Sequence, residues 1–250
     1  MSRFFTDQDL NDIRKYLSPA RLGTFENLAI TPEGAIELHQ ATMSLGVAIS
    51  AVTGLIEVGL RNAVCHELSS AFDTEDWLRH PPEGLKWAAI ERGAISNARK
   101  HAQRNEYSKL NYAEKKALDE LAFPDGIPDN FKHRKVATTR QGVLEISNGQ
   151  IVAQLTMHFW KRLFSEHYEK VLWRRALKKV FPNKTYQRSN VGEYLEVIYQ
   201  TRNRLAHHEP VYGARLEGVL TAIDFMVENM GVRRPSQEAP LAKLILPQRE

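Results

Sequence analysis

One stretch decides the fold: residues 31–72 read TPEGAIELHQ ATMSLGVAIS AVTGLIEVGL RNAVCHELSS AF. It opens with threonine and proline, a strong helix start, because threonine caps the first turn and proline fits its first position. Apolar residues then recur mostly every three or four positions, the period of an α-helix. The stretch predicts one helix of about 40 residues, roughly 60 Å long. Gly46, Gly54 and Gly59 within it predict close approach by neighbouring helices.

Similar helix signals extend along the rest of the chain. The segments with helical spacing of apolar residues, or with a composition rich in Ala, Lys and Glu, are 85–121, 148–164, 168–181, 190–207 and 213–230. Strand-like alternation is essentially absent, which predicts an all-α protein with long helices.

The loop sequence FPDGIPD at residues 123–129 interrupts this pattern. We therefore expect one domain over residues 1–232, with 98–142 as an excursion from its core. Residues 233–250 contain three prolines and predict an extended C-terminal tail.

Composition restricts the class of protein. The chain has 250 residues, 42% of them hydrophobic, enough for a substantial core. It has no uninterrupted apolar run of membrane-spanning length, and its first residues do not form a secretory signal. The single cysteine, Cys65, excludes an internal disulfide framework. These features predict a cytoplasmic protein with no membrane partner.

Basic residues are concentrated in one region. The net charge is +4 and the pI about 9.1, and between residues 161 and 188 the only acidic residues are Glu166 and Glu169. Such a surplus suits phosphate binding, which makes Arg175 and Lys179 candidate RNA-binding residues. A solvated helix face is the alternative.

The chemistry-bearing stretch is residues 201–210, TRNRLAHHEP. Asn203 and His207 are four residues apart and share a helix face. Arg202 precedes His207 by five residues, and its long side chain can swing toward the histidine. Pro210 predicts that the helix ends near His207 or His208.

These side chains suit RNA cleavage by the neighbouring 2′-hydroxyl. Imidazole moves protons near neutral pH, and guanidinium binds phosphate and stabilises its extra negative charge. A shared metal site is disfavoured, because His207, His208 and Glu209 are adjacent and point in different directions on a helix. Neither a metal nor a cofactor is expected. A purely structural role, in which the motif caps the helix end, remains open.

The order of several motifs resembles the Abi-like family of bacterial abortive-infection proteins, grouped with the HEPN domains. The motifs that carry the resemblance are Ser18-Pro19-x-Arg21-Leu22, Glu57-x-x-Leu60-Arg61-Asn62, Leu155-x-x-x-Phe159-Trp160-x-x-Leu163-Phe164, Tyr168-Glu169-x-x-Leu172-Trp173 and Arg202-Asn203-x-x-Ala206-His207-His208-Glu209-Pro210. Together they span roughly residues 15–215.

The resemblance implies a HEPN-like helical bundle that forms a homodimer and acts as a ribonuclease or toxin on RNA, in phage defence. Arg202 would then hold the scissile phosphate, Asn203 would orient it, and His207 or His208 would transfer the proton. Some HEPN toxins carry a tyrosine two residues after the histidine, as an acceptor for a nucleotidyltransferase antitoxin. Glu209 stands there in this chain, so that control is not expected. The antitoxin, the phage trigger and the RNA target stay unidentified.

The long helix carries related residues. Glu57 and Arg61 are four apart and predict either an ordinary ion pair or, with Glu209, a supporting layer behind the catalytic residues. The aromatic residues Phe159, Trp160, Tyr168 and Trp173 predict core packing rather than a base-stacking platform. The alternative function is a non-catalytic RNA- or protein-binding module that keeps the motif for structure.

Overall fold

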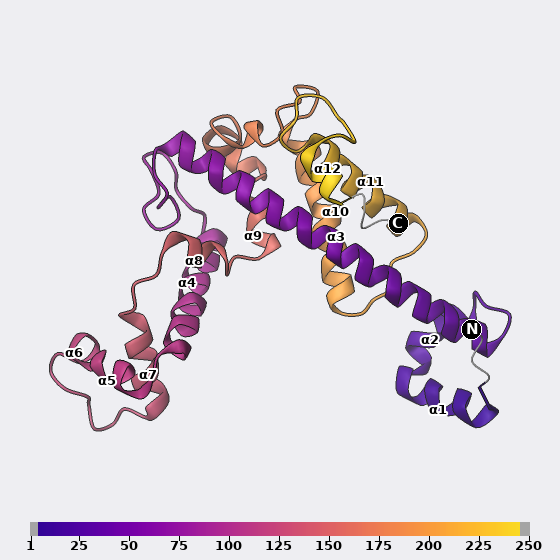
Figure 1. Cartoon of the computed structure of the whole chain (residues 1–250), viewed down its shortest axis with the longest axis horizontal. Helices are drawn as coiled ribbons and strands as arrows, with labels where there is room; N and C mark the ends of the chain where they lie inside the picture. Colours follow the sequence, from indigo (N-terminus) through magenta and orange to yellow (C-terminus); the bar gives the residue numbers. More distant parts are fainter. Residues whose placement is uncertain (1–4, 246–250) are drawn as a thin grey trace. The chain divides into compact units, whose positions relative to one another are not determined.

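The computed structural model describes residues 5–245, which are 68% helical and include no strand in this range. The prediction of an all-α protein is confirmed. The predicted long helix is also confirmed, as α3 (Pro32–Phe72, 41 residues; Figure 1). Its fully buried residues Val52, Ile56 and Leu60 recur every fourth position, so the same apolar stripe that predicts the helix also forms its buried face.

The described chain divides into two compact units, where the sequence predicted one domain. The first unit combines the residues through Leu60 with those from Phe181, and the second is Arg61–Val180. Helix α3 contributes to both, because a helix of 41 residues is long enough to serve two separate cores.

The first unit is built around the N-terminal part of α3. Its other helices are α1 (Asp7–Leu17), α2 (Pro19–Glu26), α10 (Arg188–Ala206), α11 (Ala214–Asn229) and α12 (Pro240–Ile245). A Cβ atom on Gly46 would meet Leu205 Cδ2 of α10 at 3.0 Å, and one on Gly59 would meet Met230 Cε at 3.2 Å. These two glycines permit the close approach that the sequence predicted, whereas Gly54 has nothing within 4 Å of that position.

Part of the C-terminal segment is helical where the sequence predicted extended chain. Pro240 begins α12, a position that proline tolerates because the first helical N–H needs no partner. Ala242 and Ile245 are buried, and α12 contacts α11. Burial of these apolar side chains explains why residues 240–245 fold onto the unit.

The second unit contains the C-terminal part of α3 and the remaining helices. These are α4 (Ala89–Lys109), α5 (Tyr112–Ala117), α6 (Asp119–Ala122), α7 (His133–Gly142), α8 (Asn148–Val152) and α9 (Met157–Arg162), followed by the short helices η1 (Glu166–Tyr168), η2 (Glu169–Trp173) and η3 (Leu177–Lys179). Phe159, Trp160, Tyr168 and Trp173 are buried, which confirms their prediction as core residues.

Three predicted helical segments are broken. The segment 85–121 divides into α4, α5 and α6. The segment 148–164 divides into α8 and α9, and 168–181 is a succession of π and 3₁₀ turns rather than one α-helix. In η2 both Leu172 and Trp173 are buried although they are adjacent. Side-chain burial therefore outweighs the regular helical period in this segment.

Helix α3 has one further property. By length and composition it could cross a membrane, although core helices of soluble proteins pass the same test. One third of its most apolar 18-residue window is buried. Val47 and Val58 lie on its exposed surface, with 69% and 44% of their areas accessible.

Candidate functional site

The candidate site lies where α10 ends. His207 is the helix C-cap, and His208 adopts the left-handed conformation with φ of 56°. The His208 N–H donates to Leu205 O at 2.9 Å, and the Glu209 N–H donates to Arg204 O at 2.9 Å. This is a Schellman motif, which satisfies the last carbonyl groups of the helix and redirects the chain into Pro210.

Burial of one α10 face decides which side chains reach solvent. Val191, Leu195 and Ile198 are fully buried. On an ideal helix, Asn203 lies about 140° and His207 about 180° around the axis from Ile198, whereas residue 202 lies only about 40° away. Asn203, His207 and His208 are accordingly exposed, and Arg202 lies at the edge of the packed face.

Arg202 is held by a carboxylate from α3. Its Nη1 forms an ion pair with Oε2 of Glu57, whose side chain is 14% exposed, against 34% for Arg202. The structure thus places Glu57 behind Arg202, one of the two arrangements that the sequence left open. This contact orients the guanidinium and leaves part of it accessible to an anion.

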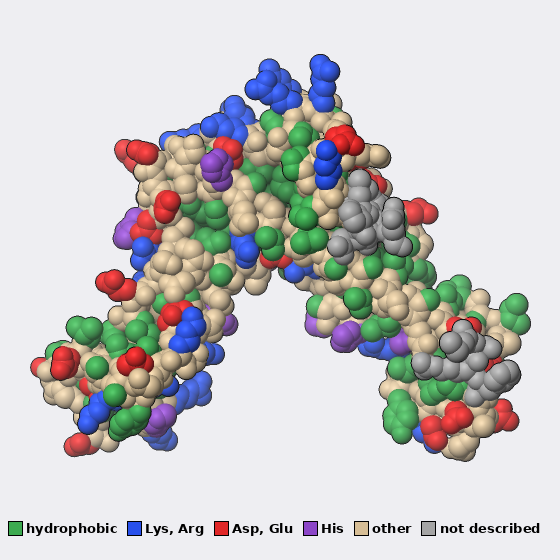
Figure 2. Space-filling model, viewed as in Figure 1, with side chains coloured by type: hydrophobic (Ala, Val, Ile, Leu, Met, Phe, Trp, Pro, Cys, Tyr) green, Lys and Arg blue, Asp and Glu red, His purple; other side chains and the backbone are tan. Residues whose placement is uncertain are grey.

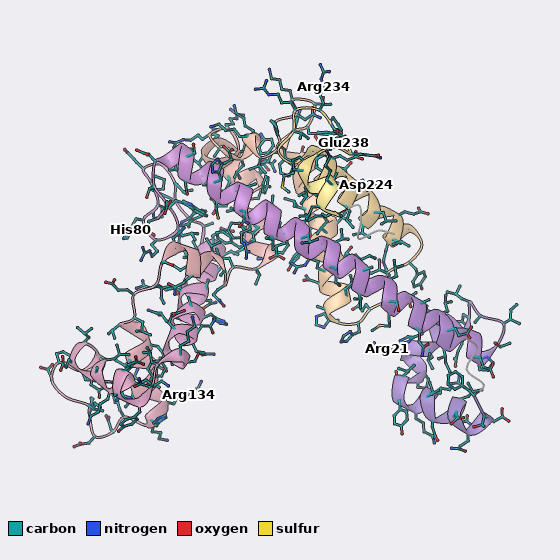
Figure 3. All side chains as sticks on the ribbon, viewed as in Figure 1. Arg21, His80, Arg134, Asp224, Arg234 and Glu238 are labelled. Carbon is teal, nitrogen blue, oxygen red and sulfur yellow. The ribbon has the colours of Figure 1, made fainter. Side chains whose placement is uncertain are left out.

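A second arginine reaches the site from α2. Arg21 Nη1 donates to the carbonyl oxygen of His208 at 3.2 Å, although the two residues are 187 positions apart (Figure 3 labels Arg21). Figure 2 shows histidine and basic side chains gathered near the end of α10. The site therefore contains cations from α2 and α10, and Glu57 comes from α3.

Glu209 does not form the expected supporting contact behind Arg202. Its Oε2 pairs with Arg204 Nη1 at 2.5 Å, across the same turn that the Schellman motif closes. Both side chains are close to half exposed, so the pair adds little stability. Glu209 therefore supports the geometry of the turn, and it pairs with Arg204 rather than with Arg202.

An apolar groove adjoins the histidine turn. It has a volume of about 230 Å³ and is lined on one side by Met43, Gly46 and Val47 of α3. His208 and Pro210 contribute to the other side. A ligand at the exposed imidazole would therefore have an apolar surface next to it.

His39 is a component that sequence reasoning missed. It is 9% exposed on α3 and packs edge-on against Phe25, with ring centroids 5.4 Å apart. Burial, together with the nearby charge of Arg21, lowers the pKa of His39 below its usual 6.5. Neutral His39 is thus favoured in the folded protein. Its separation in sequence from Arg21 gave no signal that the two side chains are neighbours.

The remaining predicted residues belong to the second unit. Arg61 is there, with its Nε buried and without a hydrogen-bond partner among residues 5–245. The Arg175 guanidinium lies over the Phe72 ring, 5.0 Å from its centroid, and Lys179 Nζ lies 3.8 Å from Glu67 Oε2. Both candidate RNA-binding side chains therefore have protein contacts already.

Within the described part of the chain, no group of three or more His, Cys, Asp or Glu side chains is arranged to hold a metal ion. The chemistry of the site rests on imidazole, guanidinium and amide groups. Comparison with family models, curated proteins and solved structures produced no match.

Proposed function

We propose that the protein is a metal-independent endoribonuclease of the HEPN type, related to the Abi-like proteins and acting in bacterial phage defence or as a toxin. The observation that carries this proposal is the exposed pair His207 and His208 at the end of α10, after an arginine that Glu57 holds in place. Exposed histidines at the same helix end as an oriented cation provide groups suited to proton transfer on a phosphodiester.

The proposed reaction uses the RNA's own 2′-hydroxyl as nucleophile. His207 or His208 accepts the proton of that hydroxyl as its oxygen attacks the adjacent phosphorus. The P–O5′ bond breaks, and the 5′-oxygen takes a proton from solvent, which leaves a 2′,3′-cyclic phosphate and a 5′-hydroxyl. Arg202 stabilises the extra negative charge on the phosphate, and Asn203 orients it.

A second copy of the chain would complete the site. One helix end supplies a sparse set of groups, and two-fold symmetry doubles it. The exposed Val47 and Met43 beside the groove provide apolar surface that a partner copy would cover. We therefore propose a cytoplasmic homodimer in which the two 202–208 segments face a shared groove.

A non-catalytic binding module is the second candidate. The Schellman hydrogen bonds, the Arg204–Glu209 pair and the contact from Arg21 all give the motif a structural use. In that case the arginines stabilise the turn, and the parent protein cleaves no RNA.

The proposal is tested by incubating the purified protein with total bacterial RNA in EDTA and mapping the ends. Cleavage with 2′,3′-cyclic phosphate ends is expected. Activity that is lost in EDTA and restored by Mg²⁺ or Mn²⁺ would contradict the mechanism.

A further inference from the structure

The first turn of α7 carries unpaired positive charge. Lys132, Arg134 and Lys135 are all exposed, and no acidic residue occurs between Lys132 and Gly142. Within residues 5–245, none of the three forms an ion pair with a carboxylate. By contrast, Lys109 on neighbouring α4 is paired with Glu106 at 2.6 Å.

Helix α7 is held firmly against its neighbours. Arg140 Nε and Nη2 donate to the two carboxylate oxygens of Asp119 at 2.6 and 2.8 Å. Gln103, buried on α4, donates from Nε2 to the carbonyl oxygens of Gly142 and Leu144, each at 3.1 Å. These contacts anchor the C-terminal half of α7, so its first turn presents its cations on a fixed support.

The charge at this turn is locally unfavourable without an anion. Lys132 is the N-cap, no side chain caps the turn, and no acidic residue lies in it. Cations near the positive end of a helix are unfavourable, because the helix dipole repels them. A bound phosphate would accept hydrogen bonds from the uncapped N–H groups and offset this repulsion.

A groove accompanies the charges. It has a volume of about 500 Å³ and is lined by Phe131, Lys132, Arg134, Lys135 and Thr138, together with one asparagine. The Lys135 ammonium lies 5.5 Å from the centroid of the Phe131 ring. The groove thus combines cations, a hydroxyl and an aromatic ring, which are the groups that bind single-stranded nucleic acid.

Acidic side chains are also present in this region. Glu120, Asp125 and Asp129 are exposed, and Figure 2 shows basic and acidic side chains over it. Three further basic residues, Arg99, Lys100 and Arg104, are exposed on α4. Exposed apolar side chains such as Leu121 lie with the acidic residues Asp119 and Glu120 instead. In the groove itself an aromatic ring lies among the cations, and this combination favours a nucleic acid strand.

We propose that the α7 groove binds an RNA strand through its phosphates. The choice of RNA over another polyanion rests on the proposed function, whereas the binding site itself does not. Phosphates would contact Lys132, Arg134 and Lys135, and a base would lie against Phe131.

The test measures binding of a fluorescein-labelled 20-nucleotide RNA of mixed sequence by anisotropy, at several salt concentrations. The variant Lys132→Gln/Arg134→Gln/Lys135→Gln should bind about a hundredfold more weakly at 0.1 M salt, with a salt slope smaller by about 2, because three phosphate contacts are lost. The control Lys15→Gln/Arg215→Gln/Arg234→Gln removes the same charge from exposed positions of the first unit and should bind almost as the parent does.

Equal weakening in both variants, or none in the α7 variant, would overturn the proposal. So would tight binding of the parent to anionic phospholipid vesicles that is lost in the α7 variant while RNA binding persists. If the variant does not fold, photocrosslinking the parent to 4-thiouridine RNA decides the matter, since the crosslinks should map to residues 130–138. If the RNA stays intact in EDTA, the ribonuclease function is refuted but the binding site is not, because anisotropy measures binding without cleavage.

Discussion

Replacing His208 by glycine tests the geometry of the candidate site. His208 holds φ of 56°, a conformation that costs an L-residue about 1–2 kcal/mol. Glycine avoids that cost but gains about 0.4–1 kcal/mol of conformational freedom in the unfolded chain. Since the ring is exposed and the contacts of residue 208 with Leu205 and Arg21 use its backbone, little else is lost. His208→Gly should therefore raise the free energy of unfolding by about 0.5–1 kcal/mol.

The assay is thermal unfolding followed by circular dichroism. For a chain of this size the gain corresponds to a rise of about 1–4 °C in the midpoint. The matched control is Ala206→Gly, which introduces the same residue where the backbone is helical and should lower stability by about 0.5–1 kcal/mol. If His208→Gly destabilises the protein as much as the control does, the proposed Schellman geometry is wrong. In the same variant, retained RNA cleavage would assign proton transfer to His207.

Three other substitutions test a buried hydrogen bond, the Glu57–Arg202 contact and the proposed dimer. Tyr168→Phe should destabilise the protein by about 1–3 kcal/mol in urea unfolding, because buried Glu91 loses a 2.8 Å hydrogen bond. Burial raises the pKa of Tyr168 from 10.0 to about 12, so the parent should lose stability between those pH values as the unfolded phenol ionises first, and the variant should lack this loss. Glu57→Gln should lower cleavage about tenfold by releasing Arg202, with under about 1 kcal/mol change in stability; unchanged turnover would refute the positioning role. Val47→Glu should convert the proposed dimer into a monomer by light scattering, and a parent that is an active monomer would exclude the dimer.

The parts of the fold that could be predicted are those with a local sequence signal, such as a helix start, an apolar period or a proline. Helix α3 follows from its start signal and apolar period. Helix α10 ends at Ala206, close to the end that Pro210 predicted. The three prolines of the tail predicted an extended chain. In the structure the apolar side chains of Ala242 and Ile245 are buried, and this burial favours a helix over residues 240–245. That burial depends on a tertiary contact with α11, which no local pattern encodes.

In the candidate site, too, the local motif could be predicted and the tertiary contacts could not. The motif around Arg202 and His207 is local and was predicted from residue type and spacing. Arg21 and His39 were not placed there, since their approach depends on the packing of α2 and α3 near the end of α10. The supporting contact from Glu57 was one of two predictions, and the structure places its carboxylate at Arg202.

The most direct test of the ribonuclease proposal measures melting and RNA cleavage on one preparation of His207→Ala, with His80→Ala as a control. His207 and His80 are both exposed, so neither substitution should change stability by more than about 0.5 kcal/mol. Loss of the proton-transfer group should reduce cleavage in EDTA at least about a hundredfold in His207→Ala, while His80→Ala cleaves as the parent does. A parent protein that leaves RNA intact, combined with a sharply lower melting temperature in His207→Ala, would contradict the ribonuclease account and assign the motif a structural role.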